Sequence, residues 1–333
     1  MATDSQQLEA RVRHCAETAE ALRNRLGERI VGNREVLDLV LTGLFAGGHA
    51  LLEGVPGIGK TMLVRTLAEA IDASFSRIQF TPDLMPADVT GTMVLFEGPD
   101  GVREFRFREG PVFANVLLAD EINRATPKTQ SAMLEAMEER QVTTDGKPRL
   151  LPKPFFVLAT QNPLEMEGTY PLPEAQLDRF LYKVLVGTPS REDLVEIIDL
   201  AARPPAAASK APVTSADEVA SFVALARDVV LTREVRDLIA RIVLATHRDN
   251  ELAPEPVRRY VRHGASPRAA LSIAMGIKAR ALIEGRAHAE RTDIPKLVKP
   301  ALRHRISLNF EGEAEGLDTD AVLDAVIEAV PMR

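Results

Sequence analysis

The chain has 333 residues, 45% of them hydrophobic, and a formal net charge of −7. This length and composition suffice for one large domain and a smaller one, each with its own core, and they argue against a disordered chain. The acidic balance argues against a protein whose main task is to wrap nucleic acid, because that task needs a strongly basic surface.

Cysteine content and hydropathy indicate the compartment. Cys15 is the only cysteine, which excludes an internal disulfide framework and fits a reducing cytosol. The first residues are polar and do not resemble a secretory signal. The longest apolar stretch, 39–52, is interrupted by glycines and is too short to span a membrane. We therefore predict a soluble, cytoplasmic protein.

Two helices are predicted before the first strand. Apolar residues recur at steps of four and three from Leu8 to Leu26, and Gly27 follows, which is typical of a capped amphipathic helix. We expect this helix to pack on the core. A coiled coil of about three heptads is the alternative. A second helix over 35–45 leads into the first core strand.

A phosphate-binding loop follows this strand. The pattern GxxxxGK[ST] is matched at every fixed position, by Gly54, Gly59, Lys60 and Thr61, and its variable positions are Val55, Pro56, Gly57 and Ile58. An apolar run precedes it and a helix beginning at Met62 follows, the context that the motif requires. The backbone N–H groups and the helix dipole would bind one anion. Lys60 is expected to reach the outer phosphates, Thr61 to offer its hydroxyl to Mg²⁺, and Met62 to contact the nucleotide. The predicted ligand is a nucleoside triphosphate; a chance match is the alternative, and the flanking elements argue against it.

Short apolar runs then alternate with helices, which predicts a parallel sheet covered on both faces. The five runs are 50–52, 75–80, 116–119, 155–160 and 182–186. Two hairpin insertions are predicted, at 92–108 and 141–151, the second turning at Asp145-Gly146. Thr126-Pro127 is expected to start a helix that continues through Glu139.

The strand pattern stops near residue 188, and helical periodicity continues to the end of the chain. We predict an α/β nucleotide-binding domain over 1–188 and an all-helical lid over 189–333. Within the lid, the proline- and alanine-rich stretch 203–212 cannot be one continuous helix and is predicted to be a mobile surface loop.

The third run ends in Asp120 and Glu121, and the ends of parallel strands open into the ligand crevice. Asp120 is expected to hold the Mg²⁺ shell and Glu121 to polarise the attacking water. A strand that merely ends in surface carboxylates is the alternative, which the upstream phosphate loop argues against.

The next strand ends in Ala159-Thr160-Gln161-Asn162-Pro163, which resembles the sensor 1 region of AAA+ ATPases. In that superfamily the residue matched by Asn162 orients the attacking water. The alternative is that Asn162-Pro163 only initiates a turn.

More specific motifs resemble the MoxR branch of the AAA+ ATPases. They are Ile30-Val31-Gly32 and the segments 80–84, 110–113, 120–125, 174–180 and 264–268. The resemblance implies that Val31 and Gly32 lie beside the adenine, and that both hairpins face a central pore or the ring surface.

The resemblance also assigns two arginines. Arg179 matches the arginine finger, which acts on the nucleotide of a neighbouring subunit and can accelerate hydrolysis by about 10³ to 10⁵. An ion pair with Asp178 is the alternative.

Arg268 resembles sensor 2. It follows Ser266 and Pro267 at the start of a predicted lid helix, where its charge and the helix dipole would face one anion. A plain surface arginine is the alternative, and the resemblance leaves open whether Arg268 acts on its own nucleotide or a neighbour's.

By this resemblance the chain is an ATPase that converts ATP to ADP and phosphate in a ring, with a hexamer expected, and that remodels or matures a protein client. Candidate clients are von Willebrand factor A domain proteins and metalloenzyme complexes. A DNA-directed motor is one alternative, disfavoured by the acidic balance and the lack of an appended DNA-binding motif. The other is an ATP-binding switch with little turnover, disfavoured by Glu121 and Arg179.

Overall fold

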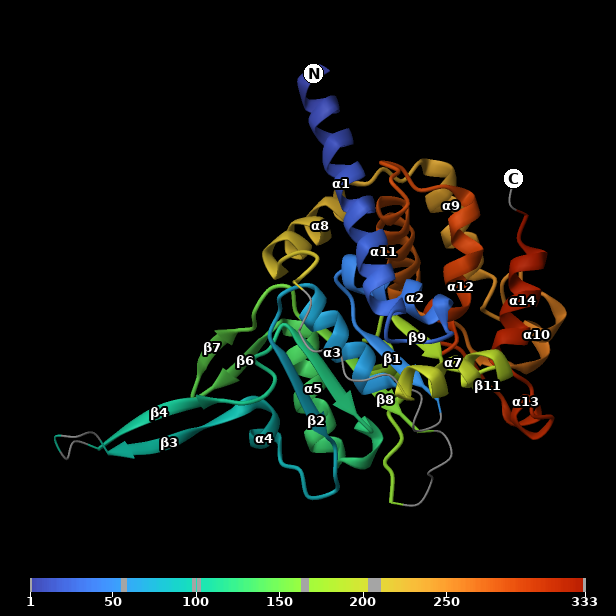
Figure 1. The fold of residues 1–333 in the computed structure, drawn as a ribbon. Helices are drawn as coiled ribbons and strands as arrows, with labels where there is room; N and C mark the ends of the chain where they lie inside the picture. The colour runs from blue at the N-terminus through green and yellow to red at the C-terminus, as the bar shows by residue number, and fades with distance from the viewer. Residues whose placement is uncertain are drawn as a thin grey trace.

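The computed structural model describes residues 2–54, 59–97, 100, 103–162, 168–202 and 211–331. Its centre is a parallel sheet with the strand order β2-β5-β8-β1-β9 (Figure 1). The strands are β1 (Ala50–Glu53), β2 (Phe75–Gln79), β5 (Val116–Asp120), β8 (Phe156–Gln161) and β9 (Tyr182–Leu185). The predicted five-stranded parallel sheet is confirmed, and each observed strand coincides with one predicted run to within one or two residues.

Helices cover both faces of this sheet, because neighbouring side chains of a strand point to opposite sides. In β1, Ala50 and Leu52 join a core that includes side chains of α1 (Ala2–Gly27), α2 (Arg34–Phe45) and α3 (Lys60–Ala70). Leu51 joins a second core with α5 (Pro127–Glu139) on the other face.

The N-terminal helix α1 is a packing helix, as its periodicity predicts. From Val12 on, its apolar stripe is fully or almost fully buried and consists of Val12, Cys15, Ala19, Leu22 and Leu26, whereas Leu8, the first residue of the predicted stripe, is exposed. It packs against α2 and α3 and against lid helix α11 (Pro267–Ile283). Cys15 is buried, and burial raises the pKa of its thiol to about 12, so this thiol is an inert packing group.

Both hairpins form as predicted. The first follows the short helix α4 (Pro86–Thr90) and pairs β3 (Gly91–Glu97) with β4 (Arg103–Glu109) in an arm that projects from the body (Figure 1). Both faces of this arm are largely exposed, and only Phe107 is half-buried on β4. The second pairs β6 (Gln141–Thr144) with β7 (Lys147–Leu150) through Asp145 and Gly146, whose φ angles of 54° and 68° are those of a type I′ turn. Residues 98, 99 and 101 of the first hairpin's predicted turn, and residue 102 at the start of its second predicted strand, lie outside the described residues.

The C-terminal part is predominantly helical. Its helices are α7 (Arg191–Ala202), α8 (Ala216–Asp228), α9 (Arg233–Leu244), α10 (Glu255–Tyr260), α11, α12 (Ile294–Leu302), α13 (Phe310–Ala314) and α14 (Thr319–Ala329). One feature corrects the all-helical prediction: β10 (Val261–His263) pairs antiparallel with β11 (Ser307–Leu308). Two such short segments, far apart in sequence, carry no strand signal until the fold brings them together. The predicted loop lies mostly outside the described residues, at 203–210.

The sheet and the lid share one apolar core, since Phe156, Tyr182 and Ile277 belong to the same buried cluster. The boundary predicted at 188/189 falls between β9 and α7 and stays a prediction. Within the described ranges, none of the helices combines the length and apolarity that a membrane span requires.

Candidate nucleotide-binding site

A cavity of about 450 Å³ lies at the carboxyl edge of the sheet. Its lining residues come from the start of α3 and the ends of three strands: Gly59, Lys60, Thr61, Met62, Arg77, Gln79, Asp120, Glu121, Thr160 and Asn162. The fold thus brings together the predicted phosphate, metal and water-orienting residues. Val55, Pro56, Gly57 and Ile58 lie outside the described residues.

Gly59 and Lys60 form the entry to α3. Gly59 is the N-cap with a φ of 79°, a left-handed conformation that suits glycine. The Lys60 ammonium donates a hydrogen bond to the carbonyl of Gly54 at 2.7 Å and so links the two ends of the phosphate loop. Burial lowers the pKa of Lys60, while Asp120, Glu121 and Glu53 act in the opposite direction.

Thr160 fixes both carboxylate residues at the end of β5. Its hydroxyl donates to Asp120 Oδ1 at 2.6 Å and accepts the backbone N–H of Glu121 at 2.8 Å. Glu121 has a φ of 57°, an uncommon conformation for a residue with a side chain, of the kind found at functional sites. Sequence reasoning did not single out Thr160 by itself, although it lies within the predicted sensor segment 159–163, two residues before Asn162.

Strand β2 contributes two further side chains that sequence reasoning missed. Arg77 Nη2 donates to Asp120 Oδ2 at 2.7 Å and to Gln79 Oε1 at 2.7 Å. Gln79 Nε2 donates to Glu121 Oε2 at 2.8 Å, and Arg124 Nη1 donates to the same oxygen at 2.9 Å. Residues 77 and 79 share one face of β2 because they are two positions apart, and this alternation is the signal that could have identified them.

Val31 and Gly32 are half-buried and precede α2. Gly32 has a φ of 67°, and a Cβ there would stand 2.7 Å from the Asp193 carboxyl carbon at the start of α7. The two residues are not among those that line the cavity. Their predicted position beside an adenine stays a prediction.

Arg179 and Arg268 lie at the opposite edge of the sheet. Arg179 precedes β9, whose first residue Tyr182 pairs with Ala50, the first residue of β1. Gly54 comes after the last residue of β1, so the length of a four-residue strand, about 13 Å, separates the two edges. Neither arginine lines the cavity that contains Lys60.

Both arginines contact Glu138 on α5. Arg179 Nε lies 3.0 Å from Glu138 Oε2, and Arg268 Nη2 donates to Oε1 at 2.7 Å. The alternative predicted for Arg179 is wrong in its partner, because Asp178 accepts from Arg305 Nε at 2.6 Å instead.

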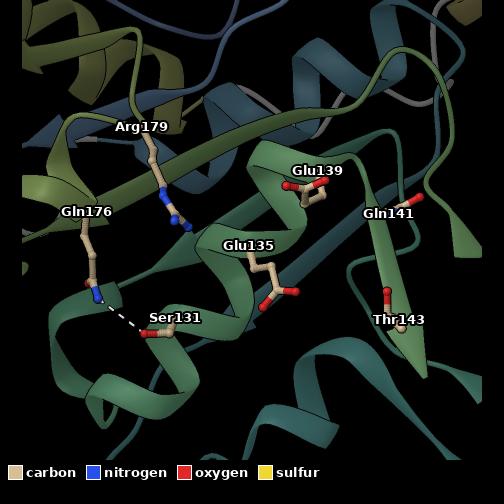
Figure 2. A pocket seen from close by; sticks show the side chains of 7 residues that line it. All are labelled: Ser131, Glu135, Glu139, Gln141, Thr143, Gln176 and Arg179. Carbon is tan, nitrogen blue, oxygen red and sulfur yellow. Dashed lines mark hydrogen bonds between the residues drawn. The ribbon is translucent and has the colours of Figure 1, made fainter. Parts of the chain in front are cut away.

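Arg179 also lines a second cavity of about 490 Å³ on the surface between α5 and β6. Figure 2 shows its guanidinium pointing toward α5, whose Ser131 accepts a hydrogen bond of 3.3 Å from Gln176 on the short helix α6 (Glu174–Leu177). Glu135 and Glu139 also line this cavity. Arg179 therefore lines a surface cavity with 29% of its side chain exposed.

The start of α11 is built as predicted, with Ser266 as N-cap and Pro267 in the first turn. The Ser266 hydroxyl accepts the backbone N–H of Arg268 at 3.2 Å and donates to Asp178 Oδ2 at 3.0 Å. In this protomer the anion at the helix start is thus the Asp178 carboxylate, whereas the sequence led us to expect a nucleotide phosphate.

The chain resembles known proteins over most of its length. Residues 49–182 match the ATPase family associated with various cellular activities (AAA), and residues 255–326 match the AAA lid domain. Chaperone MoxR1 of Mycobacterium tuberculosis is 42% identical over 91% of this chain and 79% of its own length. Protein MoxR of Paracoccus denitrificans is 29% identical over 91% of this chain and 93% of its own.

A crystal structure gives the same result. A putative ATPase from Cytophaga hutchinsonii superposes with a TM-score of 0.91 at 37% identity and covers 98% of both chains. The two family models match the AAA domain and its lid, and the relatives and the solved structure match nearly the whole chain. The protein therefore belongs to the MoxR family of AAA ATPases.

Proposed function

We propose that the protein hydrolyses ATP with Mg²⁺ in a ring of identical subunits, expected to be a hexamer, in which each active site is completed by the neighbouring subunit. One observation carries this proposal. Arg179 and Arg268 lie at the strand edge opposite the cavity that contains Lys60 and Asp120. An arginine that cannot reach its own nucleotide can reach that of a neighbour in a head-to-tail ring.

Within one subunit the cavity supplies the groups for phosphoryl transfer. Lys60 and the N–H groups at the start of α3 would hold the phosphates. Thr61 and Asp120 offer a hydroxyl and a carboxylate oxygen, ligands that suit a hard cation such as Mg²⁺, which when bound neutralises charge on the phosphate oxygens. Glu121 and Asn162 would orient the attacking water.

The neighbour would supply the remaining positive charge. Arg179 would act as the finger, and Arg268, 2.7 Å from the same Glu138 carboxylate, would act beside it on that neighbouring nucleotide. In the lone protomer Glu138 binds both arginines. We infer that the lone protomer turns over ATP poorly.

We further propose that hydrolysis in the cytoplasm drives remodelling of a protein client, for which a von Willebrand factor A domain protein or a metalloenzyme complex is a candidate. Support comes from the name of the relative Chaperone MoxR1 and from the β3–β4 arm. This arm exposes Leu95 and Phe105, which are paired across the two strands on one face, and Phe96 on the other face, and exposed apolar side chains of this kind can bind protein segments.

Mixing two inactive variants tests the shared site. Arg179→Ala retains its phosphate loop, and Lys60→Ala retains its finger. Random mixing in equal amounts should complete about one interface in four and restore a corresponding share of turnover. The matched control mixes Glu121→Gln with Lys60→Ala, because both lesions lie on the same side of the interface and no complete site can form. No recovery at any ratio with Arg179→Ala would contradict the proposal.

Affinity capture from native lysate tests the client. Glu121→Gln is expected to retain ATP without hydrolysis, and Lys60→Ala is expected not to bind it. A protein enriched only on Glu121→Gln would support remodelling, whereas nuclease-sensitive nucleic acid would favour a DNA-directed motor.

A further inference from the structure

We propose that Arg77 is a positioning residue that pairs with Asp120 Oδ2, and that it competes with Mg²⁺ for this carboxylate. The proposal rests on the function proposed above, because it assumes that Asp120 is a ligand of this ion. It adds a residue of β2 to the set that controls nucleotide binding.

The contacts of Asp120 carry the argument. Oδ1 accepts the Thr160 hydroxyl at 2.6 Å, and Oδ2 accepts Arg77 Nη2 at 2.7 Å. Both oxygens of the carboxylate therefore already have a partner. A guanidinium and a divalent cation cannot both lie against Oδ2 without strong repulsion between like charges.

The difference in burial between Thr160 and Arg77 determines which of them can leave Asp120 when a metal ion binds. Thr160 is 1% exposed on β8, which lies between β5 and β1 in the interior of the sheet. The Arg77 side chain is 47% exposed on β2, the edge strand. A long, half-exposed side chain at an edge can move into solvent at little cost, whereas the buried threonine pairs with Leu52 of β1 and directly follows Ala159, which pairs with β5.

After leaving Asp120, the Arg77 guanidinium stays in the nucleotide cavity. Arg77 lines the same cavity as Gly59, Lys60 and Thr61, so its guanidinium stays beside the residues that would hold the phosphates. Because Arg77 Nη2 also donates to Gln79, which donates to Glu121, releasing Arg77 removes one of the contacts that orient Gln79. We infer that metal binding at Asp120 and the orientation of Glu121 are coupled through Arg77.

The test measures the Mg²⁺ dependence of nucleotide binding without turnover. A fluorescent, non-hydrolysable ATP analogue is bound to the full-length protein while Mg²⁺ is titrated from an EDTA-containing buffer. The variants are Arg77→Gln, which removes the charge, and Arg77→Lys, which keeps it. The matched control is Arg124→Gln, which removes an equal charge from Glu121 but leaves the Asp120 partners in place.

For Arg77→Gln we expect the half-saturating Mg²⁺ concentration to fall about two- to fivefold, the range for a partly exposed ion pair. Arg77→Lys should stay closer to the wild type, and Arg124→Gln should change the concentration clearly less than Arg77→Gln does, since Arg124 pairs with Glu121 and would affect Asp120 only indirectly. An unchanged or higher concentration for Arg77→Gln would overturn the proposal, as would an equal fall for Arg124→Gln. Urea unfolding of each variant checks that it folds. If the wild type binds no analogue at any Mg²⁺ concentration, the proposed nucleotide site itself fails, which is a different result from an unshifted titration.

Discussion

The Tyr182 hydroxyl occupies the position that a Cβ on residue 276 would need, so this ring reaches lid helix α11 only because residue 276 is glycine. Tyr182 is fully buried and begins β9, and α11 lies across it in the core that joins sheet and lid. Within the part of the chain that the structure describes, the Tyr182 hydroxyl has no hydrogen-bond partner. Van der Waals packing, and not a hydrogen bond from this hydroxyl, therefore holds the strand and the helix close together here.

Gly276→Ala should destabilise the fold. The added methyl group cannot be accommodated by a fully buried ring, and overpacking of this kind costs about 1–3 kcal/mol. Urea unfolding measures the loss. Adding Tyr182→Phe should recover only part of it, since Leu297 and the ring carbon would remain 2.9 Å and 3.0 Å from the new Cβ. Gly27→Ala is the control, because a Cβ there has no neighbour within 4 Å. Equal stability of the two alanine variants would contradict this packing.

His49 should make stability fall in mild acid. Its Nε2 donates to the Met137 carbonyl at 3.1 Å, and its Nδ1 accepts the Val157 N–H at 3.0 Å, so the neutral ring is fully bonded. Burial lowers the pKa of His49 to about 4, below its ordinary value near 6.5. The stabilisation that the neutral His49 ring contributes to the fold is therefore complete above about pH 6.5. It is lost as the pH falls toward 4, because His49 of the unfolded chain binds its proton at a higher pH than His49 of the folded protein.

Unfolding free energies at about pH 7.5 and about pH 5 should differ by about 2 kcal/mol from this residue. His304, also buried with a lowered pKa, adds a loss of the same sign, so the comparison with His49→Gln isolates the contribution of His49. If the variant shows the same pH dependence as the wild type, His49 is not its source.

Thr160→Val should impair both stability and turnover. The change keeps the shape but leaves the Glu121 N–H without its acceptor, at a cost of about 1–3 kcal/mol. Loss of the bond to Asp120 should lower turnover about 10- to 100-fold, as is usual for residues that orient metal ligands. Thr66→Val is the control, because its buried hydroxyl has no hydrogen-bond partner among the described residues. The prediction fails if both variants keep wild-type turnover.

Arg268 should behave as a residue of the neighbouring site. Mixing Arg268→Ala with Lys60→Ala should restore turnover, for the reason given for Arg179, since both arginines contact Glu138 at the edge opposite the phosphate loop. Mixing Arg268→Ala with Arg179→Ala should restore none, because both lesions lie on one side of the interface. Recovery in the second mixture but not in the first would place Arg268 at its own nucleotide.

Contiguous motifs of the sequence determined the family, the sheet and the centre of the site. The phosphate loop, the Asp120-Glu121 pair and Asn162 each follow an apolar strand, and the ends of parallel strands meet at one edge, so local patterns were enough to bring them together. The Asp145-Gly146 turn and the start of α11 were predictable for the same reason, because turns and caps depend on neighbouring residues.

Only the tertiary structure decided which side chains bond across the strands. Arg77 meets Asp120 because Gln79 of β2 pairs with Asp120 of β5, and no local pattern specifies that register. The shared contact of Arg179 and Arg268 with Glu138 joins a loop, the lid and α5, which lie far apart along the chain. Long-range packing places such residues together, and this is why the sequence named both arginines but not the carboxylate that binds them.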